Sequence, residues 1–175
     1  MASNTAKNKR FSLLGQGTWF LGDSEANRQE EIRALQTGID LGMTLIDTAE
    51  MYGKGRAEEL VGEALEGRRD KVFLLSKVLP SNASREGTKT ACEQSLRRLR
   101  TDVIDLYMLH WQGDYPFEET IAAMTDLIRE GKILSWGLSN MDVDGIAQIF
   151  ALVQGKTCAA NEIMYNLSRR GVELD

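Results

Sequence analysis

The sequence predicts an α/β protein with a parallel sheet, and three observations support this fold class. Segments with the 3.6-residue periodicity of an amphipathic helix alternate with short apolar runs, as in successive βαβ units. The run at 72–78 is apolar rather than alternating, as expected for a strand covered on both faces. Polar residues stand at the same end of successive runs. With 175 residues, of which 42% are hydrophobic, the chain can form one domain with a core.

The elements of the first half follow from local signals. Ser24 is a suitable N-cap for the first helix, and Gly42 is placed to close it. Gly67 is placed to stop the second helix, whose apolar residues recur at helical spacing. The expected elements are a helix over about 25–42, the second strand within 44–49, a helix over about 56–66 and the third strand over 72–78.

The second half repeats the same unit. Pro116 suits the first turn of one helix, and Asp142 is a suitable N-cap for another. Residues 168–175 are polar and are expected to end without a helix, and residues 1–10 are expected to be a polar tail before one domain over 11–175. The expected elements are a helix over about 84–100, a strand over 103–110, a helix over about 117–130, a strand over 133–139, a helix to about 153 and a last strand over 158–164.

Composition excludes several classes of function. The net charge of -5 argues against a broad surface for nucleic acid or anionic membranes. Cys92 and Cys158 are far apart, which favours a reducing compartment over a disulfide framework. No apolar run reaches the roughly 18 residues of a membrane span, and the start lacks the apolar core of a signal peptide, so a cytoplasmic location is expected. His110 is the single histidine, which excludes metal sites built on two histidines, and no metal is expected.

The βα repeat leaves two architectures, a doubly wound sheet or a barrel. A dinucleotide-binding sheet needs a glycine-rich loop after its first strand, but in Gly15–Phe20 the third glycine is replaced by Phe20. A barrel instead places functional residues at the carboxyl ends of several strands. Five successive apolar runs end in polar residues, which are Asp47, Lys77, His110, Ser139 with Asn140, and Glu162. This shared register favours the barrel.

Each of these residues also has an ordinary interpretation. Lys77 is the least ordinary, because an unpaired lysine in an apolar strand is costly to bury, and a nearby Asp47 would remove that cost. The other candidates, taken one at a time, could be turn, rim, loop or packing residues: Asp47, His110, Tyr52, Trp19 and Trp111. The ordinary interpretation weakens because it must explain the same register in every strand.

Together these side chains suit proton transfer to an oxygen that gains negative charge. A lysine ammonium beside Tyr52 would stabilise its phenolate, and an aspartate would keep Lys77 charged. A neutral His110 could orient a carbonyl. Reduction of that carbonyl needs a hydride, which no side chain supplies, so a nicotinamide cofactor is implied. Ser139 and Asn140 offer a hydroxyl and an amide to a nicotinamide carboxamide. A hydrolase using His110 and a serine is disfavoured, because no GxSxG motif is present.

The sequence resembles the aldo-keto reductase family across nearly its whole length, and most closely its small bacterial members that act on aldehydes and methylglyoxal. The combination of motifs in family order is specific, although Gly-Leu-Ser-Asn alone would be weak. The matching stretches are Gly15–Trp19, Ile46–Gly53, Ser76–Val78, Asp105–Trp111, Gly131–Ile133, Gly137–Asn140 and Asn161–Asn166.

This resemblance implies a (β/α)₈ barrel and NADPH-dependent reduction of aldehydes and ketones to alcohols. It makes Tyr52 the proton donor, tuned by Lys77 and Asp47, with His110 positioning the carbonyl. The implied cofactor-binding residues are Gly17, Thr18, Trp19, Asp47, Ser139, Asn140 and Glu162. The implied residues around a small carbonyl substrate are Trp19, Tyr52, His110 and Trp111.

Two departures from the family pattern change these expectations. Glu162 stands where the family has glutamine, and an ionised carboxylate accepts hydrogen bonds but donates none, which is expected to weaken cofactor binding by about 1–3 kcal/mol. A barrel of this type takes roughly 250 residues, so this sequence is expected to form about six of the eight strands and to be truncated at its C-terminus. The alternative function is therefore an idle fragment that lacks most of the cofactor region and acts at most as an interaction module. Its open sheet edges favour self-association.

Overall fold

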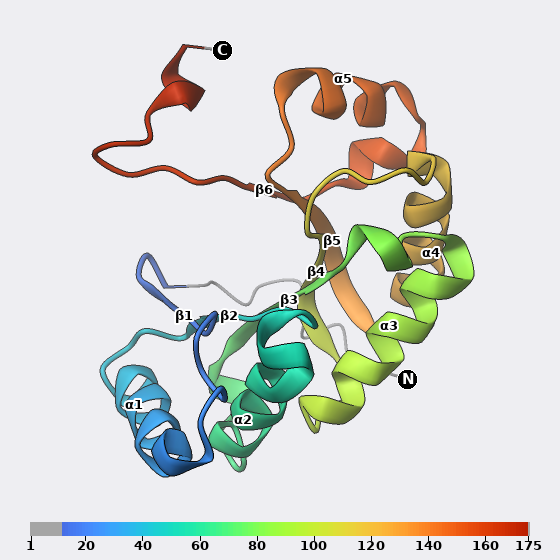
Figure 1. The fold of residues 1–175 in the computed structure, drawn as a ribbon. Helices are drawn as coiled ribbons and strands as arrows, with labels where there is room; N and C mark the ends of the chain where they lie inside the picture. The colour runs from blue at the N-terminus through green and yellow to red at the C-terminus, as the bar shows by residue number, and fades with distance from the viewer. Residues whose placement is uncertain (1–11, 175) are drawn as a thin grey trace.

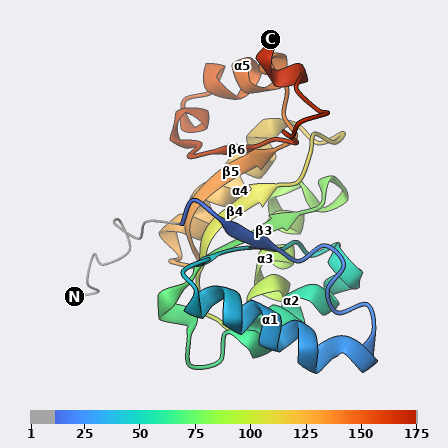
Figure 2. The ribbon, with the colours of Figure 1, turned by 90° about the vertical axis from the view of Figure 1, so that its left-hand side faces the viewer.

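A computed structural model describes residues 12–174 and shows six parallel strands curled into an incomplete (β/α)₈ barrel (Figure 1). The strands are hydrogen-bonded in chain order from β1 to β6. In the view of Figure 2 the strands β3 to β6 rise in that order, with α1 and α2 below and α5 above. The elements are β1 (Gly15–Gly17), α1 (Arg28–Asp40), β2 (Leu45–Asp47), α2 (Arg56–Ala64), β3 (Phe73–Val78), α3 (Arg85–Arg98), β4 (Ile104–Leu109), α4 (Phe117–Arg129), β5 (Ile133–Ser139), α5 (Val143–Ala151) and β6 (Asn161–Glu162).

The predicted order of elements is confirmed, and the differences lie at element ends. The side chain of Ser24 makes no capping hydrogen bond, because a 3₁₀ turn at Glu25–Asn27 precedes α1. Pro116 occupies the N-cap position of α4 rather than its first turn. Asp142 caps α5 as predicted, accepting a hydrogen bond from the backbone N–H of Gly145, and Ser84, which was not predicted as a cap, accepts one from Gly87 at the start of α3. The polar tail predicted for residues 1–10 lies outside the described residues.

The later part of the chain departs further from the expected elements. The last strand is only Asn161–Glu162, because β5 pairs with it at these two positions alone. The predicted coil at 168–175 contains a short 3₁₀ turn at Gly171–Glu173, held by an ion pair of 2.8 Å between Arg170 and Glu173. In Figure 1 the segment after β6 extends away from the helices.

The main core lies between the outer face of the sheet and the helices. Hydrophobic side chains that are fully buried in this layer include Ile46, Leu60, Leu74, Leu99, Ile104, Met124, Leu127 and Trp136. A smaller cluster of Leu75, Leu106 and Met108, with Phe73 against it, occupies the inner face. Five of the six residues of β3 are buried, on both faces of the sheet, so the predicted burial of the run at 72–78 on both faces is confirmed. Among the described residues, no helix is long and apolar enough to cross a membrane.

A buried ion pair joins α2, α3 and β3 behind the loop that follows β2. Glu58 is fully buried and accepts hydrogen bonds of 2.6 Å from Ser76 Oγ and from Arg98 Nε. The Arg98 side chain also packs against Gly55, where a Cβ atom would come within 2.7 Å of it. Gly55 has a φ of +94°, which favours glycine in addition to the lack of space. These contacts hold the loop at a defined distance from β3.

The packing of α2 predicts a clear difference between two leucines. Leu60 is fully buried in the main core, whereas Leu41 follows α1 and is 78% exposed. We expect Leu60→Ala to lower the free energy of unfolding by about 2–5 kcal/mol, because it removes buried surface and leaves a cavity. Leu41→Ala should change it by less than about 0.5 kcal/mol. Urea unfolding followed by circular dichroism measures both, and similar losses in the two variants would contradict this packing.

Candidate active site

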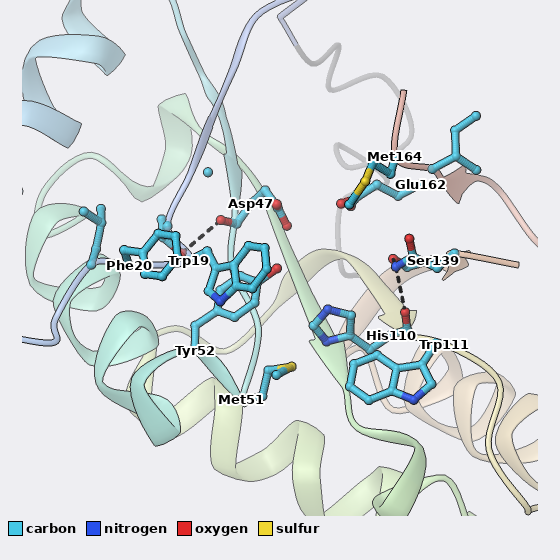
Figure 3. Close-up of a pocket in the computed structure, with 15 residues that line it drawn as sticks. Trp19, Phe20, Asp47, Met51, Tyr52, His110, Trp111, Ser139, Glu162 and Met164 are labelled. Carbon is cyan, nitrogen blue, oxygen red and sulfur yellow. Dashed lines mark hydrogen bonds between the residues drawn. The ribbon is translucent and has the colours of Figure 1, made fainter. Parts of the chain in front are cut away.

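A cavity of about 660 Å³ opens at the carboxyl ends of the strands (Figure 3). Trp19, Phe20 and Tyr52 lie on one side of it, and Ser139 and Glu162 on the other. Its walls are formed by Gly17, Thr18, Trp19, Phe20, Leu21, Asp47, Met51, Tyr52, His110, Trp111, Ser139, Asn140, Glu162, Ile163 and Met164. The residues predicted from strand ends therefore do meet in one place. Lys77 is fully buried and reaches this wall through Asp47 and Tyr52.

The Lys77 ammonium is the centre of the charged part of the site. Its Nζ atom donates a hydrogen bond to Asp47 Oδ1, lies 3.5 Å from Glu162 Oε2 and lies 3.4 Å from the carbonyl oxygen of Thr48. Burial disfavours its charge, but the two carboxylates outweigh this effect and raise the pKa of Lys77. Burial also raises the pKa of Asp47, which Lys77 partly offsets. The pKa of Glu162 is raised by its burial and by the charge of Asp47.

Tyr52 stands at the start of the turn between β2 and α2, with 8% of its surface exposed. Lys77 Nζ lies 5.4 Å from the centre of its ring. Burial raises the pKa of Tyr52, and the Lys77 charge offsets only part of that rise. Lys77 acts in the expected direction, because its charge lowers the pKa of Tyr52. Burial has the larger effect, so the pKa of Tyr52 is raised and not lowered. Tyr52 is protonated throughout the neutral range.

Glu50 fixes the loop that carries Tyr52, although it was not among the residues predicted for the site. Its Oε1 atom accepts hydrogen bonds of 2.6 Å from the Leu79 backbone N–H and 3.0 Å from Asn82 Nδ2. Its own backbone N–H donates to the Lys77 carbonyl oxygen at 3.2 Å. The segment with Tyr52 is thus tied to the segment with Lys77. The signal available in the sequence was its position within the motif, two residues before Tyr52.

His110 follows β4 and is 7% exposed. Its Nδ1 atom is buried without a hydrogen-bond partner among the described residues, which favours the tautomer with its proton on Nε2. Burial, with a smaller contribution from Lys77, lowers the pKa of His110 to about 4. The imidazole is therefore neutral at physiological pH. Its ring lies 5.7 Å from the Tyr52 ring and 4.7 Å from the Trp111 ring, between centroids.

Ser139 and Asn140 present one donor and one acceptor at the end of β5. Asn140 Nδ2 donates to the His110 carbonyl oxygen at 3.3 Å and to Ser139 Oγ at 3.0 Å. These bonds use the amide protons of Asn140 and leave its Oδ1 atom as an acceptor, while the Ser139 hydroxyl keeps its proton to donate. Asn140 has a φ of +52° and its backbone N–H donates to the Glu162 carbonyl oxygen at 2.7 Å.

Thr18 and Trp19 lead out of β1 on the other side. Thr18 is fully buried, and both its backbone N–H and its hydroxyl donate to the Asp47 carbonyl oxygen, at 3.1 and 3.0 Å. Its hydroxyl proton thus anchors Asp47. Trp19 is 59% exposed and stacks on Phe20 and Tyr52, with centroid distances of 5.2 and 6.2 Å. The apolar wall residues Phe20, Met51 and Met164 were not predicted, because no polar pattern marks them.

The chain is similar to bacterial reductases over most of its length. It is 54% identical to methylglyoxal reductase YeaE of Escherichia coli over 162 residues, which cover 93% of this chain and 57% of that protein. It is 34% identical to an NADH-specific methylglyoxal reductase of the same organism, over 89% of this chain and 58% of that protein. The chain thus spans a little over half the length of these relatives.

Solved structures give the same result. An aldo/keto reductase from Klebsiella pneumoniae in complex with NADP and acetate matches with a TM-score of 0.93 and 50% identity, over 94% of this chain and 58% of that chain. A second structure of a Klebsiella pneumoniae aldo-keto reductase, in complex with NADPH, matches with the same TM-score and identity. The model of the Aldo/keto reductase family matches residues 13–174. By sequence and by fold, this chain belongs to the aldo/keto reductase family.

Proposed function

We propose that this chain carries the active site of an NADPH-dependent reductase that converts aldehydes and ketones to alcohols, with Tyr52 as the proton donor. The observation that carries this proposal is the contact of Tyr52, Lys77, Asp47 and His110 at the edge of one cavity. The similarity to methylglyoxal reductases supports small carbonyl compounds as the substrate class.

Tyr52 would protonate the carbonyl oxygen as negative charge develops on it. The hydride that adds to the carbonyl carbon comes from the reduced nicotinamide when that cofactor is bound. The Lys77 ammonium, 5.4 Å from the ring centre, favours the phenolate that remains after the proton has left. Asp47 holds that ammonium in place and keeps it charged. Tyr52 therefore supplies one proton, and Lys77 with Asp47 stabilises the negative charge that remains on Tyr52.

His110 would orient the carbonyl in the neutral form. Its Nδ1 atom is buried without a hydrogen-bond partner among the described residues, which favours the tautomer with the proton on Nε2, so the ring can donate a hydrogen bond to a carbonyl oxygen next to Tyr52. Trp19, Trp111 and Phe20 would enclose the rest of a small substrate, because they form the apolar part of the same wall. Such a wall excludes water from the reacting centre only where a ligand or further protein covers it, since Trp19 is 59% exposed.

The polar groups near β5 and β6 fit a nicotinamide carboxamide. The Ser139 hydroxyl can donate to the carboxamide oxygen, while Asn140 Oδ1 and the Glu162 carboxylate can accept from its NH₂ group. The fit of the carboxamide rests on these three groups, one donor and two acceptors, in the cavity that Tyr52 and His110 also line. NADPH is proposed over NADH because the Klebsiella pneumoniae structures are described with NADP and NADPH. One of the relatives is NADH-specific, so the affinities for NADPH and NADH should be compared directly.

The alternative is a fragment that does not catalyse and associates through its open sheet. A second cavity, of about 390 Å³, lies on the inner face of the sheet and is lined by Leu45, Phe73, Leu75, Leu106 and Met108 among others. Within the described residues, β1 and β6 form the two edges of the sheet. The unpaired strand edges and this apolar cavity favour association. Folded protein that does not bind NADPH would support this alternative.

Removal of the Tyr52 hydroxyl tests the proton donor. We expect Tyr52→Phe to lower the rate constant for aldehyde reduction by at least about a hundredfold, because general acid catalysis is lost. NADPH affinity, measured by quenching of tryptophan fluorescence, should stay within about twofold because the ring remains. Tyr165→Phe, at an exposed tyrosine outside the cavity, is the matched control. Undiminished turnover in Tyr52→Phe would remove Tyr52 from the mechanism.

Replacement of the Glu162 carboxylate by an amide tests its contact with the nicotinamide carboxamide. Glu162→Gln should tighten NADPH binding by about 1–3 kcal/mol, because glutamine can donate to the carboxamide as well as accept from it. Titration calorimetry measures the affinity directly. Unchanged or weaker binding would count against a contact between Glu162 and the carboxamide.

The pH dependence follows from the two pKa shifts at the reacting centre. Neutral His110 is present above its lowered pKa of about 4, and protonated Tyr52 is present below a pKa that is raised from its ordinary value of about 10. We therefore expect kcat/KM to be level between about pH 5 and pH 9, to fall in acid near pH 4 and to fall in alkali above about pH 10. A titration near pH 6.5, the ordinary pKa of histidine, would show that His110 is not held in its neutral form.

A further inference from the structure

The cavity wall carries more negative than positive charge. Asp47 and Glu162 both line it, and the cation they share is Lys77. His110 adds no charge, because its pKa is lowered to about 4. With both carboxylates ionised, the described part of the wall therefore has an excess of one negative charge. A carboxylate excess beside aromatic rings is the environment that favours a cationic ligand.

The excess charge belongs to Glu162 rather than to Asp47. Lys77 Nζ is in direct hydrogen-bond contact with Asp47, whose side chain is 27% exposed. Glu162 Oε2 is farther away, at 3.5 Å from Nζ, and its side chain is 42% exposed. Figure 3 shows Glu162 on the side of the cavity that faces Tyr52 and Trp19. The carboxylate of Glu162 is thus the one that remains available to a ligand.

We infer that Glu162 makes this site discriminate between the two redox states of a nicotinamide ring, in favour of the oxidised one. The inference rests on the proposed function, in which the ring lies beside Ser139, Asn140 and Glu162. The oxidised ring is a pyridinium cation and the reduced ring is neutral, so a nearby carboxylate stabilises only the former. Trp19 and Tyr52, whose rings stack 6.2 Å apart, lie on the opposite side of the cavity.

This preference assists reduction and slows release of the product cofactor. When hydride leaves the reduced ring, two electrons leave with one proton, and the ring gains one positive charge. A carboxylate that stabilises this positive charge lowers the barrier to hydride departure. The same interaction holds the oxidised cofactor more tightly after the alcohol has formed. Glu162 would therefore be a residue that determines specificity for cofactor redox state, in addition to its contact with the carboxamide.

The experiment measures the affinities of NADP⁺ and NADPH for the full chain at about pH 8, above the ordinary pKa range of a carboxyl group. The wild type is compared with Glu162→Gln, which has nearly the same shape and no charge. Glu66→Gln is the matched control, because Glu66 is exposed on the turn after α2, outside this cavity. We expect the ratio of the NADPH Kd to the NADP⁺ Kd to fall at least about fivefold in Glu162→Gln. It should stay within about twofold of wild type in Glu66→Gln.

A second measurement separates this inference from the proposed function. The probes are the cation 1-methylnicotinamide and its neutral 1,4-dihydro form, which lack the phosphate and adenosine parts. Binding is followed by the indole N–H signals of Trp19 and Trp111 in NMR spectra. Failure of both whole cofactors to bind would count against the proposed function of this chain, while preference for the cationic probe, lost in Glu162→Gln, would still support the inference.

Two results would overturn the inference. One is a ratio of cofactor affinities that is the same in Glu162→Gln and wild type, within about twofold, which would leave the proposed function intact. The other applies if neither cofactor binds: equal binding of the two ring probes, or binding of neither, would show that the wall does not select a cation.

Discussion

The buried ammonium of Lys77 is the constraint on which the site depends. An unpaired charge at this depth would cost several kcal/mol, so the fold must bring carboxylates to it. β2 pairs with β3 so that Asp47 lies beside Leu75, two residues before Lys77 on the same face. The backbone N–H of Glu50 continues this pairing past the end of β2, to the Lys77 carbonyl oxygen. The ion pair and the strand register therefore support each other, and both determine where Tyr52 begins its turn.

The sequence was sufficient for the arrangement of the strands because apolar runs and polar strand ends are local signals. Lys77 stood out as an expensive residue in an apolar run, and it is fully buried. The hydrogen bonds of Glu50 could not be predicted from its place in the motif, since one of them comes from the backbone N–H of Leu79, which follows β3 in the chain. Nor could the sequence predict that the Nδ1 atom of His110 finds no hydrogen-bond partner in the described part of the chain, because this results from the packing around the ring.

The ends of elements were harder to predict than their order. Ser24 has the residue type of an N-cap, but a 3₁₀ turn begins after it, so its hydroxyl finds no helical N–H to accept from. The last strand is short because pairing, and not apolar composition, decides its length, and β5 offers partners only to Asn161 and Glu162. A sequence pattern indicates which element a segment can form. The hydrogen-bond partners that neighbouring segments provide determine the length of that element.

The charge balance at Lys77 links stability to chemistry. The Lys77 ammonium lies within 4 Å of two carboxylates, those of Asp47 and Glu162, and its Nζ atom lies 5.4 Å from the centre of the Tyr52 ring. A Tyr52 phenolate would be a third negative group stabilised by the same positive charge. Burial opposes ionisation of Tyr52, so the site at rest holds its proton on oxygen and its negative charge on Asp47 and Glu162. Proton transfer to a substrate moves negative charge onto Tyr52. That step is less costly where a positive charge arises at the same time near Glu162, and loss of hydride from a nicotinamide ring is a reaction that creates one.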